Sequence, residues 1–366
     1  MPDSVWQQAL DRMVKRVDVT GPKLRGAFPH YADPVNGEWT TTPDGDWTGG
    51  FWPGMCWLAA KSTAGARYRR WAGEWAERLR PRAQSDTAFR GFLFYYGAVP
   101  GAVLCNEPKA REIALEAARQ WVTTYNPNAG CFPLGDAAEE ASDVGRGEAS
   151  IDTVPGAALL VWAATAANEP AWRSLAVSHA RRHVELCVRP DGSVCQSASF
   201  DPATGAVTRR YTHKGFSNES TWARAQAWAI VGYALMHQWT GEADFLEVAR
   251  RTADWWIAHV PPSRVAYWDF DAPVGPDTEH DSSATAITAA ALLKLGALTK
   301  RREYRDAGEA TARALVEGYL DTRGILDRGC YSKRINLATR NELIWGSYYL
   351  FEALHVLAGK LEPAKI

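Results

Sequence analysis

The stretch SIDTVPGAALLVWAAT (Ser150–Thr165) is apolar around its whole circumference, yet it opens on a carboxylate, Asp152. A helix that lacks a polar face is one that is buried on all sides. WARAQAWAIVGYAL (222–235) and SSATAITAAALLKL (282–295) have the same character. In contrast, EPKAREIALEAARQWV (107–122) gathers its apolar residues on one stripe, so its other face meets solvent. The chain therefore contains two kinds of helix.

A periodicity of 3.6 residues predicts twelve helices in which solvent-facing and buried segments alternate. They are expected at 3–18, 50–63, 66–82, 87–98, 106–125, 150–167, 169–187, 220–238, 242–258, 281–297, 302–320 and 341–358. This alternation predicts an all-α fold, an (α/α)6 barrel of six inner and six outer helices, with an open solenoid of helical hairpins as the alternative. Because no Gly/Ser-rich or Pro-rich linker divides the chain, we expect residues 1–366 to form one domain.

The connections between these helices differ in length. Those from an inner to the next outer helix are short, whereas those from an outer to an inner helix are mostly long. The long ones, around 19–49, 126–149, 188–219, 259–280 and 321–340, span roughly 20 to 32 residues against a usual median of about 4–6. They fall at one end of the barrel, where long loops usually build a site. One contains a predicted β-hairpin around DPATG (201–205).

Composition excludes several classes of partner. The formal net charge is -1 and no Lys/Arg block occurs, which argues against nucleic acid or an anionic membrane surface. No run reaches the roughly 20 apolar residues of a membrane span, and the N-terminus lacks a signal-peptide pattern, so we expect a cytoplasmic protein. The six cysteines include no CxxC pair and are expected to be reduced and buried. Seventeen Trp residues suggest flat platforms for sugar rings.

Five of the six inner helices open with an acidic residue beside Ser or Thr. The segments are DGDWTGG (44–50), QSDTAF (84–89), SIDTV (150–154), NESTW (218–222), HDSSA (280–284) and RNELIW (340–345). Asp, Ser and Thr are favoured N-caps, and capping alone explains any one of them. Asp152 fits capping less well, because Pro155 would fall at N3 and has no N–H to donate.

Enzymes that hydrolyse glycosides usually have two carboxyl groups in an aromatic cleft, of which one is protonated and the other ionised. Asp86 and Asp152 are the pair favoured here, because each opens a buried helix. With fewer amide donors around it, Asp152 holds a proton more readily and is favoured as the acid.

The sequence resembles a known family, the unsaturated glucuronyl hydrolases of glycoside hydrolase family 88. The resemblance lies in WTGGFWPGMCWLA (47–59), DTAFRGFLFYYGA (86–98), SIDTVPGAALLVWAA (150–164), THKGFSNESTWARAQAWAIVGYA (212–234), HDSSATAITAAALLKL (280–295) and IWGSYYLFEAL (344–354). It implies an (α/α)6 barrel that removes a 4,5-unsaturated uronic acid from the non-reducing end of oligosaccharides left by polysaccharide lyases. The implied reaction is hydration of the C4=C5 bond, without metal or organic cofactor.

The resemblance also implies roles for individual residues. Asp152 matches the acid/base, and Asp86 matches a second Asp that holds sugar hydroxyls and helps to keep its partner protonated. The substrate-binding positions it implies are Trp47 and Trp222 for stacking, Thr212 for a loop contact to the sugar, and Arg224 and Trp228, with Arg224 as a partner for the anionic uronate.

Four positions depart from the family pattern, and two of them lie at expected substrate contacts. Gln196 stands where a His is familiar, and Lys214 where Gln is. Ser85 and Ala225 replace a His and a Gly. The Lys214 ammonium would either bind a sulfate or a second carboxylate, or be only a solvated charge on a loop.

HARRHVELC (179–187) places His179, His183 and Cys187 on one helical stripe, a spacing that suits zinc. No fourth ligand is evident, so we expect no metal site. The rival enzyme classes are an unsaturated rhamnogalacturonyl hydrolase and another (α/α)6 sugar enzyme such as an epimerase. The rival of a different kind is a non-catalytic sugar-binding or helical scaffold protein, in which the acidic residues are only caps.

Overall fold

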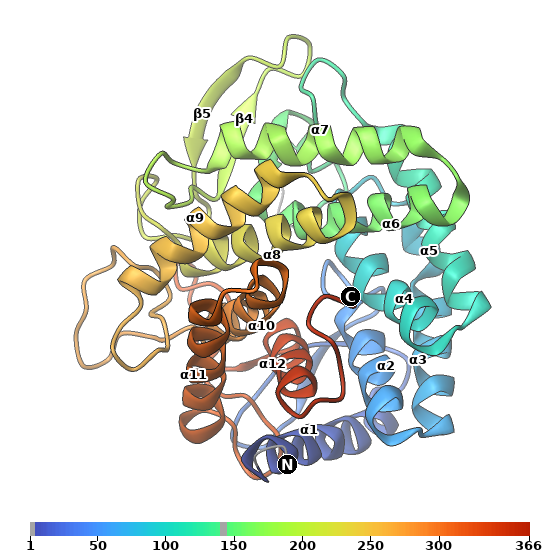
Figure 1. The fold of residues 1–366 in the computed structure, drawn as a ribbon, viewed down its shortest axis with the longest axis vertical. Helices are drawn as coiled ribbons and strands as arrows, with labels where there is room; N and C mark the ends of the chain where they lie inside the picture. Colours follow the sequence, from blue (N-terminus) through green and yellow to red (C-terminus); the bar gives the residue numbers. More distant parts are fainter. Residues whose placement is uncertain (1–3, 140–144) are drawn as a thin grey trace.

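Six buried helices form a closed inner ring in the computed structural model, which describes residues 4–139 and 145–366. They are α2 (Phe51–Thr63), α4 (Arg90–Cys105), α6 (Ala158–Ala167), α8 (Ala223–Thr240), α10 (Ser282–Thr299) and α12 (Ile344–Leu357). Each packs on the next, and α12 packs back on α2, which closes the ring. The closure confirms the predicted (α/α)6 barrel and excludes the open solenoid (Figure 1).

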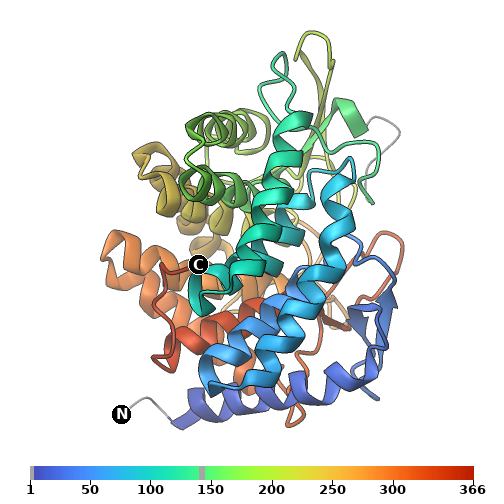
Figure 2. The same ribbon diagram turned by 90° about the vertical axis from the view of Figure 1, so that its right-hand side faces the viewer.

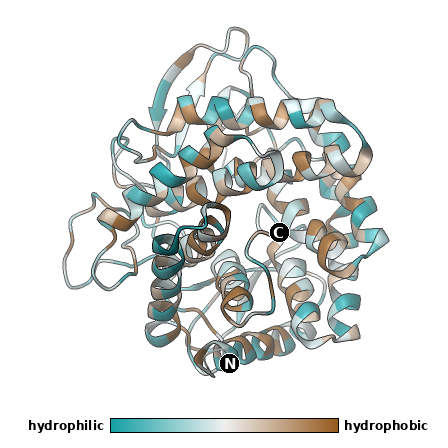
Figure 3. Cartoon of the chain, viewed as in Figure 1, coloured by the Kyte–Doolittle hydropathy of each residue, from teal (hydrophilic) through white to brown (hydrophobic). Residues whose placement is uncertain are grey.

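Six outer helices surround this ring. They are α1 (Ser4–Thr20), α3 (Ala66–Leu79), α5 (Pro108–Trp121), α7 (Pro170–Cys187), α9 (Ala243–His259) and α11 (Arg302–Gly318). Each rests in the groove between two inner helices; α11, for example, packs on α10 and α12. Figure 3 shows the two kinds side by side, with hydrophilic residues along α11 and a predominantly hydrophobic α10.

All six inner helices begin later than the sequence predicts, by one to eight residues, and α6 shows the longest delay. The sixth helix was expected from 150, but residues 151–157 form two 3-10 turns and α6 begins at Ala158. Pro155 explains the delay, because it has no N–H for an α-helical hydrogen bond. The fourth helix, expected at 87–98, runs from Arg90 to Cys105 and contains Pro100.

The long connections gather at one end of the barrel, which we call the loop end. Figure 2 shows them on its right-hand side together with β1 (Phe28–Ala32) and β2 (Trp39–Thr42), while the C-terminal segment lies on the left. The expected hairpin is present as β4 (Ser197–Phe200) and β5 (Val207–Tyr211).

Two small sheets tie the loops together, and the sequence did not predict either of them as a sheet. In one, β3 (Glu148–Ser150) joins the hairpin in the order β3-β4-β5. In the other, β6 (Glu342–Leu343) pairs with β1, so that segments about 310 residues apart lie side by side.

Two glycines allow inner elements to meet closely at the loop end. A Cβ built on Gly91 of α4 would lie 2.6 Å from the Cα of Gly156, which is in the turn before α6. Real Cβ atoms do not approach so closely, so both positions need glycine. This contact holds the turn that carries Asp152 against the ring.

The cysteines and the one membrane-length helix both belong to the core. All six cysteines are free and buried, as expected for reduced thiols. Among the described residues, Ser282–Thr299 is long and apolar enough to cross a membrane, but 83% of it is buried inside the barrel. Its hydropathy is therefore explained by its place in the inner ring.

Candidate active site

A small cavity at the loop end brings together most of the residues singled out in the sequence. Its lining consists of Trp47, Phe89, Asp152, Lys214, Trp222, Arg224 and Trp228. Six of them lie just before, or in the first turns of, an inner helix, because the long loops lead into the N-termini of these helices, and Lys214 lies in the loop between β5 and α8. About 200 Å³ of empty space lies between these side chains, but none of it is wide enough for a water molecule, so a sugar ring enters only when the lining side chains move apart.

Asp152 does not cap a helix. It lies in the 3-10 turn Ile151–Thr153, where its own backbone N–H donates to the Ser150 hydroxyl. Among the inner helices, only α10 has a side-chain cap, in which Asp281 accepts from the amides of Ser283 and Ala284. The capping explanation therefore holds for Asp281 and fails for Asp152, whose carboxylate is left to face the cavity.

The β-hairpin delivers Gln196 to Asp152. Because β4 pairs with β3, residue 196 lies beside residue 151, and the Ile151 N–H donates to the Gln196 carbonyl at 2.9 Å. The Gln196 side-chain amide then donates from Nε2 to Asp152 Oδ2 at 3.3 Å. Its Oε1 accepts from the Thr212 hydroxyl at 2.6 Å and from the Lys214 amide at 3.3 Å, which fixes the direction of the amide.

Through these contacts, Gln196 and Thr212 hold the Asp152 side chain in place. Both side chains are at least 97% buried behind Asp152, and neither lines the cavity. Gln196 fixes one oxygen of the carboxylate, while Thr212 orients Gln196. The sequence analysis gave both residues a substrate-binding role, whereas in the structure their side chains hold the acid.

Aromatic rings form most of the lining that surrounds Asp152. Trp47 packs against Trp345 at 4.8 Å between ring centroids, and its Nε1 donates to the Tyr331 hydroxyl at 3.3 Å. Trp228 packs on Phe92 at 4.9 Å. Flat apolar faces of this kind suit the C–H faces of a sugar ring. The sequence analysis missed Tyr331, although it lies in the long loop 321–340.

Arg224 is held by the protein itself. Its Nη1 donates to Asp281 Oδ2 at 2.8 Å and to the Cys330 carbonyl, and its Nη2 donates to the Tyr331 carbonyl. Both charged side chains are 1% exposed or less. Asp281 therefore neutralises the guanidinium, and only Nε is left without an acceptor among the described residues.

Asp86 is not brought to this cavity. Its carboxylate, 38% exposed, forms an ion pair with Arg146 at 3.5 Å and accepts from the Asp136 amide. It lines a separate cavity that also contains Arg90 and Gln120. Burial lowers the pKa of Arg90 to about 10, although the Asp86 charge opposes this shift. Part of the adjoining loop, 140–144, lies outside the described residues.

The histidine stripe supports the Asp152 turn from behind. His179 Nδ1 accepts from the Phe132 amide, so its proton lies on Nε2, which is 3.3 Å from the Thr153 hydroxyl. His183 Nε2 lies 3.4 Å from the same hydroxyl. Cys187 Sγ contacts the Gln196 carbonyl at 3.7 Å. All three side chains thus contact residues that hold Asp152.

Burial also keeps this stripe uncharged. It lowers the pKa of His183 to about 4 and, together with the neighbouring His183, lowers that of His179 well below its usual value. It raises the pKa of the Cys187 thiol. At neutral pH the stripe is therefore a set of neutral packing groups.

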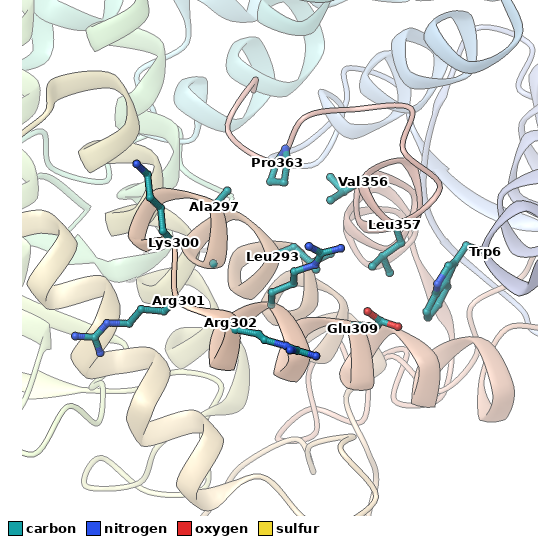
Figure 4. A pocket seen from close by; sticks show the side chains of 12 residues that line it. Trp6, Leu293, Ala297, Lys300, Arg301, Arg302, Glu309, Val356, Leu357 and Pro363 are labelled. Atoms are coloured by element: carbon teal, nitrogen blue, oxygen red, sulfur yellow. The ribbon is translucent and has the colours of Figure 1, made fainter. Parts of the chain in front are cut away.

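Another cavity, larger than the one at Asp152, lies at the other end of the barrel, between α10, α11 and α12 (Figure 4). Lys300 and Arg301 point away from its centre, and Glu309 is its one carboxylate. Glu309 is paired with Arg313 at 3.4 Å, and Trp6 is the single aromatic ring in the lining, so we place the active site at the loop end.

Comparisons with known proteins agree with this assignment. The family model described as Glycosyl Hydrolase Family 88 matches residues 23–351. The unsaturated glucuronyl hydrolase of Bacillus sp. (strain GL1) is 34% identical over 364 residues, which cover 96% of each chain.

Solved structures agree as well. The crystal structure of the Bacillus sp. GL1 enzyme superimposes with a TM-score of 0.91 over 96% of each chain. A structure named as UGL with an Asp-to-Asn substitution and dGlcA-Glc-Rha-Glc has the same identity, 34%, coverage, 96%, and TM-score, 0.91. The match in sequence and in fold over nearly the whole chain shows that this protein belongs to Glycosyl Hydrolase Family 88 and is a glycoside hydrolase.

Proposed function

We propose that the protein removes a 4,5-unsaturated uronic acid from the non-reducing end of lyase-generated oligosaccharides by hydrating the C4=C5 bond, with Asp152 as the acid and base. The observation that carries the proposal is the buried Asp152 carboxylate, which lines an aromatic cavity together with Trp47 and is held at one oxygen by Gln196. The names of the relatives support the substrate class.

In this reaction protonated Asp152 gives its proton to C4, and the positive charge that develops at C5 is shared with the ring oxygen. Water adds at C5, and the Asp152 carboxylate takes one of its protons, which restores the acid. The C5–O5 bond of the resulting hemiketal then breaks to a ketone at C5. The hemiacetal left at C1 expels the aglycone sugar. Protons balance, and water is the only reactant besides the substrate.

The surrounding residues have defined tasks in this scheme. The Gln196 amide fixes Asp152 Oδ2, so that Oδ1 is the oxygen directed to the substrate. Trp47, Trp222 and Trp228 bind the ring and exclude bulk water. For Asp86, we retain the role of contacting sugar hydroxyls, which requires the ion pair with Arg146 to open.

The experiment follows the near-ultraviolet absorbance of the C=C–carboxylate group in unsaturated disaccharides prepared with a lyase. The wild-type protein should remove this absorbance, and Asp152→Asn should not, although it should unfold at the same temperature. A matched saturated glucuronide should stay intact, because it has no double bond to hydrate.

Two results would refute the proposal. Cleavage of the saturated glucuronide would show displacement at C1. A change in Trp fluorescence without any loss of absorbance would show a protein that binds sugar and does not act on it.

A further inference from the structure

The cavity that contains Asp86 also contains a buried arginine, Arg90. It lies where α4 begins and α5 ends, and about 620 Å³ of it is accessible to water. None of its described lining residues lines the Asp152 cavity, although Arg90 directly follows Phe89, which does. A cavity of this size is within the range of ligand sites, about 300–1,000 Å³, and takes a sugar ring without movement of the lining side chains.

Arg90 has hydrogen bonds but no ion pair in the part of the chain that the structure describes. The residue is 2% exposed. Its Nε donates to the Thr87 carbonyl at 3.2 Å and its Nη1 to the Ala83 carbonyl at 3.0 Å, which leaves Nη2 without an acceptor among the described residues. Burial lowers the pKa of Arg90 to about 10, so the guanidinium is still charged at neutral pH. Because a buried charge is costly when it is unpaired, an anion that pairs with Arg90 would bind favourably.

The other charges of this cavity are already paired. Asp86 forms an ion pair with Arg146 at 3.5 Å and accepts from the Asp136 amide. Arg146 also donates to Asp136 Oδ2 at 2.6 Å. The Asp86 charge acts on Arg90 but forms no ion pair with it in the described structure. The positive charge that this cavity offers to a ligand is therefore that of Arg90.

The uncharged part of the lining suits a sugar. Gln84 and Gln120 present side-chain amides that have no hydrogen-bond partner among the described residues. The hydroxyls of Thr123 and Thr124 donate to backbone carbonyls of α5, and their oxygens are still able to accept. Amides and hydroxyl oxygens are the groups that pair with the hydroxyls of a carbohydrate, whereas a guanidinium pairs with a carboxylate or a sulfate.

We propose that this cavity is a second carbohydrate site, in which Arg90 binds the carboxylate or sulfate of an acidic sugar and the two glutamines bind its hydroxyl groups. The inference rests on the contacts of the cavity and is independent of the reaction at Asp152. Two sources would supply such a group, namely the aglycone part of the enzyme's substrate or a separate acidic glycan. The planar guanidinium pairs with the acid from either source, so the experiment has to distinguish them.

Three monosaccharides with the same ring test the site. Glucose, glucuronate and glucose 6-sulfate differ at C6, and each is titrated into the protein by isothermal titration calorimetry at constant ionic strength. At least one of the two acids should bind wild type about tenfold or more tightly than glucose, which is the size of a charge-assisted hydrogen bond. Arg90→Gln should remove this preference, and Arg90→Lys, which keeps the charge, should retain it.

A second variant leaves Arg90 and its hydrogen bonds in place. Gln120→Glu keeps the shape of the side chain but adds a carboxylate to the cavity, so acid and glucose should bind it with affinities within about twofold of each other. Arg305→Gln, in the cavity at the other end of the barrel, is the control and should bind all three sugars as wild type does. The proposal is overturned if wild type shows no preference for an acid. It is also overturned if Arg90→Gln, or Gln120→Glu should Arg90→Gln fail to fold, keeps the wild-type preference.

Competition identifies the source of the acid. In the Asp152→Asn background, the titration with the preferred acid is repeated in the presence of a saturating unsaturated disaccharide that has an acidic aglycone. If the disaccharide abolishes the Arg90-dependent binding, the group that Arg90 takes belongs to the substrate's own aglycone. If the Arg90-dependent binding persists, the site takes a separate acidic glycan. Both results support a site at Arg90, and neither requires turnover.

Discussion

Acidification should destabilise the fold through His183, which is buried beneath the turn that carries Asp152. Burial lowers its pKa from 6.5 to about 4. The unfolded chain therefore takes up this proton near pH 6.5 and the folded chain only near pH 4. Between these values the unfolded state holds more protons, so the free energy of unfolding falls as the pH falls, and above pH 6.5 the effect vanishes.

The size of the effect follows from the two pKa values. At pH 4.5 the unfolded state is almost fully protonated at this site, whereas the folded state is mostly neutral. The difference lowers the free energy of unfolding by about 2.5 kcal/mol, because one pKa unit corresponds to about 1.4 kcal/mol. This is a large part of the roughly 5–15 kcal/mol by which proteins are stable.

Urea unfolding of wild type and His183→Gln at pH 7 and pH 4.5 measures this contribution. The variant loses buried contacts at both pH values but has no proton to take up, so its deficit relative to wild type should shrink by about 2.5 kcal/mol at pH 4.5. Val177→Ala, a buried and non-titratable position on the same helix, should have the same deficit at both. If the His183→Gln deficit also stayed constant within about 0.5 kcal/mol, burial would not be what holds His183 neutral.

Three further predictions concern charge pairs and packing. Asp281→Asn should lower the free energy of unfolding by about 3–5 kcal/mol, because it leaves the buried Arg224 charge uncompensated; the exposed Asp277→Asn is its control in thermal melts. Gly91→Ala should lower the free energy of unfolding by about 1–3 kcal/mol or more, because the added methyl group pushes α4 away from Gly156. Gly73→Ala has open space around it and should not lower the free energy of unfolding in the same melts. Asp86→Asn should lower kcat at least about tenfold and Arg146→Gln should not; equal losses in the two variants would mean that Asp86 serves only to hold the loop through Arg146.

Much of the barrel could be predicted from local sequence. Ser282–Thr299 has no polar face, and a helix with that composition is stable only when it is surrounded by other helices. The opposite holds for Arg302–Gly318, whose charges require a solvent face. The turn signal DPATG likewise identified the hairpin, which Gln196 directly precedes and Lys214 follows. These features depend on residues within one or two turns of each other.

The start of α6 shows where local patterns were insufficient. The apolar run from Ser150 onward has helical periodicity, but Pro155 and the close contact of Gly156 with Gly91 make residues 151–157 a pair of tighter turns. This departure matters for function, because it releases Asp152 from capping and turns it to the cavity.

The partners of the polar side chains were decided only by the tertiary structure. The sequence by itself determined which helices are buried, where the loops gather and which acids, tryptophans and cations lie near the loop end. It did not determine that Asp281 forms an ion pair with Arg224, that Arg146 forms one with Asp86, or that Lys214 lines the Asp152 cavity. The physical reason is that burial follows from the periodicity of neighbouring residues, whereas an ion pair or hydrogen bond in a site depends on how loops distant in sequence fold against one another.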